Sequence, residues 1–177
     1  MAQLHINGVP NLDRNTEEQL ADILTRSAAS VNKCEPLIIP LVNQYQQATK
    51  DYERSHIEHQ IETVLREALQ SIYAPEKLAH AVKLLTDLAL CDVRVDRAVQ
   101  HDSSSIVLYC RVMSVEALLK LEEMIDSGRL SQLLSDMFSL VVTVSLSTEE
   151  YERLIALLTS AAGIRQLLTF KYKSKIN

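Results

Sequence analysis

Glycine is scarce in this chain, and its scarcity excludes several classes of nucleotide-binding protein. The 177 residues include 3 glycines, which lie too far apart to form the glycine-rich loop that cradles a phosphate. There are 4 prolines and no tryptophan. So few turn-forming residues favour helices over an all-β fold, and we expect a core of Leu, Ile, Val and Ala.

Cysteine pairs are also lacking. Cys34, Cys91 and Cys110 are widely spaced and form no CxxC motif, which is typical of a reduced, cytoplasmic protein. The N-terminus has no charged segment followed by an apolar run, so we expect no signal peptide. The longest apolar stretch, near residues 37–42, is far shorter than the roughly 20 residues that span a bilayer, so we expect no membrane insertion.

The balance of charge argues against nucleic acid as a partner. The formal net charge is −5, whereas a nucleic-acid-binding protein needs a basic surface that displaces counterions. The densest basic run is Lys171, Lys173 and Lys175 near the C-terminus, and we interpret it as a solvated tail.

The first half of the chain has helical patterns. Residues 1–14 are polar and contain turn formers, which predicts a flexible tail. Asn15 is a candidate N-cap for a helix that ends near residues 31–34. Pro36 and Pro40 mark the start of the next helix, whose pattern continues to about residue 73 with or without a break near Ser55. A further helix begins at Pro75, which makes 15–91 a helical region.

The second half alternates strand and helix patterns. Residues 92–113 predict a β-hairpin, Ser114 a helix N-cap and Gly128 the end of that helix. A short helix, a strand at 140–146, a helix capped by Ser147 and a last strand at 167–172 follow. The order β-β-α-α-β-α-β predicts an α+β fold, in which 92–177 form an α/β sandwich module with helices on one face of a mostly antiparallel sheet.

Candidate catalytic and metal-binding residues are sparse. His56 and His59 share a helix face with nearby glutamates, the best zinc candidate in the chain, but the spacing is not HExxH and a solvated helix face explains it. Cys91 and Cys110 lie in apolar surroundings without a local basic partner, so we expect them to pack in the core. We therefore expect no catalytic residues, no cofactor and no metal site.

One part of the sequence resembles a known family. The residues are the run Val107 to Leu118, the break at 127–130, the strand at 142–144 and the helix start Ser147-Thr148-Glu149-Glu150-Tyr151. Together they resemble the N-terminal module of the TNF-receptor-associated death-domain adaptor (TRADD) family, over about residues 105–163. The resemblance implies a non-catalytic α/β sandwich that binds another signalling protein through a sheet or edge surface.

Three functions follow as hypotheses. The first is an intracellular adaptor that assembles signalling complexes. The second is a scaffold that self-associates through its helical half, because a long amphipathic helix is hard to bury in one small core. The third is a ferredoxin-like enzyme or ligand-binding domain, which requires a pocket where His80, His101, Arg94, Arg111 or Asp96 converge. For partner binding we select exposed strand residues, namely Arg94, Asp96, Arg111, Thr143 and Ser145.

Overall fold

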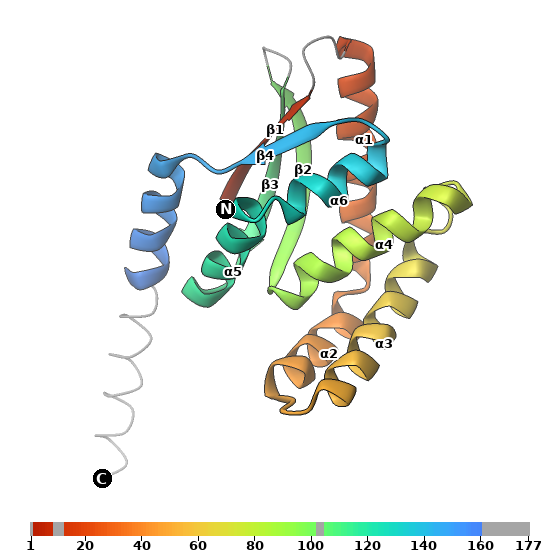
Figure 1. The fold of residues 1–177 in the computed structure, drawn as a ribbon, viewed down its shortest axis with the longest axis vertical. Coiled ribbons are helices and arrows are strands. Elements are labelled where there is room, and N and C mark those ends of the chain that lie inside the picture. The colour runs from red at the N-terminus through yellow and green to blue at the C-terminus, as the bar shows by residue number, and fades with distance from the viewer. Residues whose placement is uncertain (1, 9–12, 102–104, 161–177) are drawn as a thin grey trace.

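A four-stranded antiparallel sheet with helices packed against it forms the centre of the protein (Figure 1). The computed structural model describes residues 2–8, 13–101 and 105–160. The strands are β1 (Ala2–Gly8), β2 (Val93–His101), β3 (Ser105–Val112) and β4 (Val142–Ser145), in the order β2-β3-β1-β4. The predicted α+β class is therefore confirmed.

The first strand corrects the sequence prediction of a flexible tail over residues 1–14. β1 lies inside the sheet, where it pairs with β3 on one side and with β4 on the other. Leu4 and Ile6 are buried and face the helices, opposite Leu108 and Ile106 of β3. Because β1 completes the module predicted at 92–177, that module has no separate core: the buried residues from Ala2 to Leu154 form one cluster.

Four helices occupy the chain between β1 and β2. They are α1 (Arg14–Lys33), α2 (Glu35–Gln47), α3 (Asp51–Leu69) and α4 (Pro75–Leu90). The N-cap of α1 is Asp13, not Asn15, because the Asp13 carboxylate accepts a hydrogen bond from the Thr16 N–H at 2.7 Å. The long helical pattern breaks at residues 48–50, ahead of the predicted position, and Pro40 lies inside α2.

The second half follows the predicted order. β2 and β3 form the hairpin, and α5 (Val115–Asp126) begins at Ser114, whose hydroxyl accepts from the Ala117 N–H. Gly128, in the left-handed conformation at φ 78°, separates α5 from α6 (Arg129–Phe138). Residues 148–160 are helical, and the Ser147 hydroxyl accepts from the Glu150 N–H. The strand predicted at 167–172 lies outside the described residues.

Helices cover one face of the sheet and close both of its edges. α4, α5 and α6 lie over one face (Figure 1). At the β2 edge, the Thr25 hydroxyl of α1 donates to the Ala98 carbonyl and accepts from the Ala98 N–H. At the β4 edge, the Ser135 hydroxyl of α6 does the same for Val142, and Ser131 accepts from the Val144 N–H. At Ala98, Val142 and Val144, hydroxyls thus occupy backbone groups through which another strand would pair.

The position of β1 can be tested by truncating one buried side chain. Leu4→Ala should lower the free energy of unfolding by about 2–5 kcal/mol, because it opens a cavity in the core. Gln3→Ala, next in sequence but on the opposite face of the sheet, should cost far less. Urea denaturation measures the unfolding free energy of both variants. Equal unfolding midpoints for Leu4→Ala and the wild type would show that β1 does not pack in the core.

The closure of the β2 edge can be tested at Thr25. Thr25→Val keeps the side-chain shape but leaves the Ala98 N–H and carbonyl without their partner, at an expected cost of about 1–3 kcal/mol in unfolding free energy. Thr63→Val is the matched control, because the exposed Thr63 hydroxyl bonds only the His59 carbonyl of its own helix. Chemical denaturation compares the two variants, and a similar small cost for both would show that the α1 contact adds little.

Candidate functional site

The face of the sheet opposite α4, α5 and α6, called here the outer face, gathers polar and basic side chains. Antiparallel register fixes its membership, because residues paired across strands project to the same side. The strands place on it Gln3, His5, Arg94, Arg97, Val99, Val107, Tyr109, Arg111, Thr143 and Ser145.

The centre of the outer face is an arginine stacked on a tyrosine. Arg97 and Tyr109 are paired in register on β2 and β3, and the guanidinium carbon lies 4.8 Å from the centroid of the ring. This is a cation–π arrangement. Beside it, Val99 is 44% exposed, whereas its cross-strand partner Val107 is buried. The result is a small apolar and aromatic patch next to a positive charge.

A bulge in β2 creates this pair. The register shifts between Val95 and Arg97, which leaves Asp96 as the extra residue of the bulge. Strict alternation from Val93 and Val95 would direct residue 97 toward the core. The bulge instead places Arg97 on the outer face and Ala98 on the core side. The signal of the bulge in the sequence is Arg97 itself, a charged residue at a position where the alternation requires an apolar one. The residues selected for binding from the sequence included neither Arg97 nor Tyr109.

Two of the selected residues form an ion-pair cluster with the helical half. Arg111 Nη2 donates to Glu35 Oε1 at 2.7 Å and to the side-chain oxygen of Asn32 at 3.2 Å. Arg94, paired in register with Arg111, lies with Nε 3.7 Å from the same Glu35 oxygen and with Nη2 3.4 Å from Asp92. The cluster attaches the junction of α1 and α2 to the end of the hairpin, so these arginines are partly engaged within the chain.

The other selected residues are dispersed. Thr143 and Ser145 are exposed on the outer face of β4, which is the edge strand opposite to β2, the strand of Arg94. Asp96 occupies the bulge. The described residues do not bring together the side chains named for the enzyme hypothesis, because Arg94 and Arg111 meet Glu35 while His80 is exposed on α4. The His101 side chain lies outside the described set.

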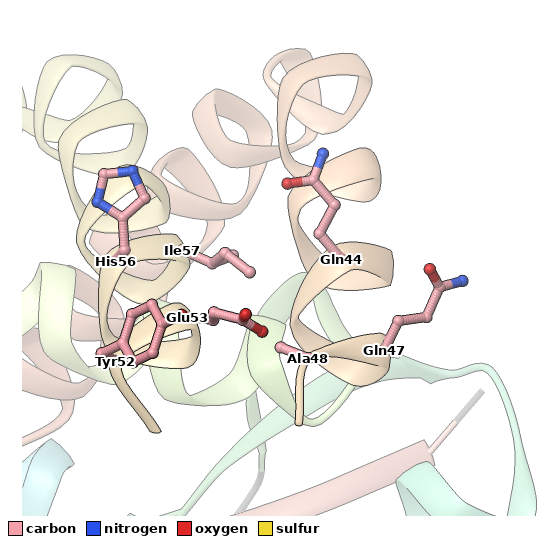
Figure 2. Close-up of a pocket in the computed structure, with 7 residues that line it drawn as sticks. All are labelled: Gln44, Gln47, Ala48, Tyr52, Glu53, His56 and Ile57. Carbon is pink, nitrogen blue, oxygen red and sulfur yellow. The ribbon is translucent and has the colours of Figure 1, made fainter. Parts of the chain in front are cut away.

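A second feature is a groove of about 440 Å³ between α2 and α3 (Figure 2). Ala48 and the buried Ile57 provide apolar lining, and Glu53 extends between the two helices. Tyr52 stands at one end, 68% exposed. The remaining lining residues are Gln44, Gln47 and His56.

The histidines of α3 do not form the zinc site considered from the sequence. His59 Nδ1 lies 3.9 Å from Glu62, and His56 lines the groove beside Glu53. Within the described ranges, no group of three or more His, Cys, Asp or Glu side chains is arranged to hold a metal ion.

The thiols differ in their surroundings. Cys110 is fully buried on the core side of β3, and burial raises its pKa from 9.0 to about 12. Burial also raises the pKa of the half-buried Cys91 thiol, and Cys34 is half-buried at the junction of α1 and α2. A thiol held protonated in an apolar core is a packing group, because the thiolate is the nucleophilic form.

No described helix is long and apolar enough to cross a membrane. Comparison with known proteins found no matching family model, no matching curated protein and no matching solved structure.

The state of Cys110 predicts the order in which the thiols react. A pKa three units higher (12 − 9 = 3) lowers the thiolate fraction about a thousandfold near pH 8.5. Ellman's reagent should therefore label Cys34 in the folded protein and reach Cys110 only in urea, with the labelled positions mapped by mass spectrometry. Labelling of Cys110 at the rate of Cys34 without denaturant would contradict this. Cys34→Ser is the control that identifies the fast site.

Proposed function

We propose that this protein is a non-catalytic cytoplasmic adaptor module that binds another signalling protein through the outer face of its sheet. The resemblance of residues 105–163 to the TRADD N-terminal module motivates the proposal. The observation that carries it is the outer face itself, where Arg97 is stacked on Tyr109 beside the exposed Val99.

The composition of this patch supports protein recognition. Tyrosine and arginine are enriched among the residues that dominate binding energy at protein interfaces. Stacking on the ring also limits the motion of the Arg97 side chain, which reduces the entropy that binding would otherwise cost. Val99 adds apolar area that a partner would remove from water.

The charge of the face indicates the chemistry of the partner. The whole chain carries a formal charge of −5, yet Arg94, Arg97 and Arg111 lie together on the outer face. Glu35 and Asp92 offset part of that charge around Arg94 and Arg111, and Arg97 contacts the neutral ring of Tyr109. A partner surface with carboxylates around an apolar contact is therefore complementary to the outer face.

The proposal is tested by reversing one charge. Arg97→Glu should weaken binding of the partner at least about tenfold, because it removes the stacked cation and repels an acidic surface. The measurement is quantitative mass spectrometry of proteins that copurify with the tagged full chain, followed by titration of the purified partner. Arg66→Glu is the matched control, since Arg66 is an exposed arginine on α3 with the same change in charge.

Three outcomes decide the test. A partner lost with Arg97→Glu and retained with Arg66→Glu supports the proposal. A partner that both variants retain, or that both lose, contradicts the assignment to the outer face. If the wild-type chain enriches no protein, the adaptor function is rejected.

A further inference from the structure

Every exposed residue of α2 is uncharged. Glu35, at its first position, is half-buried and paired with Arg94 and Arg111, and residues 36–49 contain no Asp, Glu, Lys or Arg. The exposed set, called here the neutral face, consists of Pro36, Leu37, Ile39, Pro40, Asn43, Gln44, Gln46 and Gln47. A helix surface in contact with water ordinarily carries charged residues. Three of the nine exposed positions of the neighbouring α3 are charged, namely Asp51, Arg66 and Glu67, whereas none of the eight on α2 is.

The neutral face exposes apolar area and continues into the groove. Leu37 is 62% exposed. Helical spacing aligns Leu37, Leu41, Gln44 and Ala48 along one side of α2, and Gln44 and Ala48 line the groove against α3. Tyr52 extends this surface across the α2–α3 turn. Apolar side chains and uncharged amides therefore form a strip along α2 and its groove with α3, in which Glu53 is the acidic lining residue.

We infer that the chain self-associates through this strip, with the neutral face of α2 in one copy packed along the α2–α3 groove of a second copy. Charge is the first argument for a second copy as the occupant. Two copies that each carry −5 repel one another, and the neutral face is a surface along which they can meet without opposing like charges.

Hydrogen-bonding capacity is the second argument. Asn43, Gln44, Gln46 and Gln47 each carry an amide that both donates and accepts, so such a surface is complementary to a copy of itself. A two-fold axis places the same patch on both subunits, which requires this kind of self-complementarity. A surface of one charge sign lacks it. The amides accordingly favour a second copy of the chain as the occupant of the neutral face. The partner of the outer face, by contrast, would be selected by charge.

This interface is separate from the proposed adaptor surface. The neutral face belongs to the helical hairpin, whereas Arg97 and Tyr109 lie on strands of the sheet. The two proposals can therefore fail independently. A variant that loses self-association should still bind the adaptor partner in the Arg97-dependent manner.

The experiment is sedimentation velocity of the full chain from about 1 to 200 µM, for the wild type and two variants. The wild type should form dimers. Leu37→Glu should raise the dimer Kd at least about tenfold, because it places a carboxylate in the neutral face, against a groove that already carries Glu53. Leu119→Glu is the matched control: Leu119 is 50% exposed on α5, away from the hairpin, and its replacement should leave the Kd unchanged. Circular dichroism verifies that both variants fold.

Ionic strength supplies an independent measurement. Because the neutral face carries no charge, and the Glu53 carboxylates and the net charge of −5 repel between copies, raising the salt from 50 to 500 mM should leave dimerisation unchanged or strengthen it. A wild-type chain that stays monomeric at 200 µM overturns the inference. The inference is also overturned if Leu37→Glu has the same dimer Kd as the wild type, or if Leu119→Glu raises the Kd as much as Leu37→Glu does. Dimerisation that weakens as salt rises would identify an ionic interface elsewhere and overturn it as well.

Discussion

Pairing of the N-terminal strand between β3 and β4 is the constraint on which the rest of the structure depends. β1 provides the only described link between the β2–β3 hairpin and β4, since those two parts of the sheet do not pair with each other. Its buried residues continue the core face across the middle of the sheet, where α4, α5 and α6 pack. Without β1, the hairpin and β4 would expose unpaired backbone groups in the centre of the fold.

The edges of the sheet show how a small antiparallel sheet avoids pairing with other chains. Thr25, Ser131 and Ser135 offer hydroxyls to backbone groups that would otherwise be free. Beyond the end of β4, Glu150 of the last described helix accepts from the Gln3 N–H of β1 at 3.2 Å. Strand addition at these edges would displace the helices. The surfaces that remain for contact are therefore built from side chains, on the outer face and on the α2–α3 hairpin.

Much of the fold could be predicted because its signals are local. The Ser114 cap, the left-handed Gly128 and the Ser147 cap depend on neighbouring residues and were read correctly. β1 was missed although Ala2, Leu4 and Ile6 alternate with polar residues, because the stretch is short and has only two large apolar residues. Its partners lie about 100 residues away in β3 and about 140 away in β4. The break at 48–50 was also misplaced, since no proline or glycine marks it.

The candidate site was harder to predict than the fold for a physical reason. Alternation assigns each strand residue to one face, and a single bulge at Asp96 reverses that assignment for every residue that follows it in β2. Alternation selected Arg94 and Arg111, and both of these arginines form ion pairs with Glu35. These ion pairs form because the start of α2 lies against the β2–β3 hairpin. No sequence pattern in either segment predicts that the two lie close together.

The interior position of β1 also imposes an order on synthesis. Ala2 pairs with Cys110, 108 positions later (110 − 2 = 108), and Ile6 pairs with Val144. At roughly 5–20 residues per second, a ribosome needs about 7–30 s to make the first 145 residues. β3 is made only at residues 105–112 and β4 only at the end of that interval, so Leu4 and Ile6 first lack both neighbouring strands and then lack β4. The four helices are made before either strand that pairs with β1, so the nascent chain is most open to misassociation before β4 emerges.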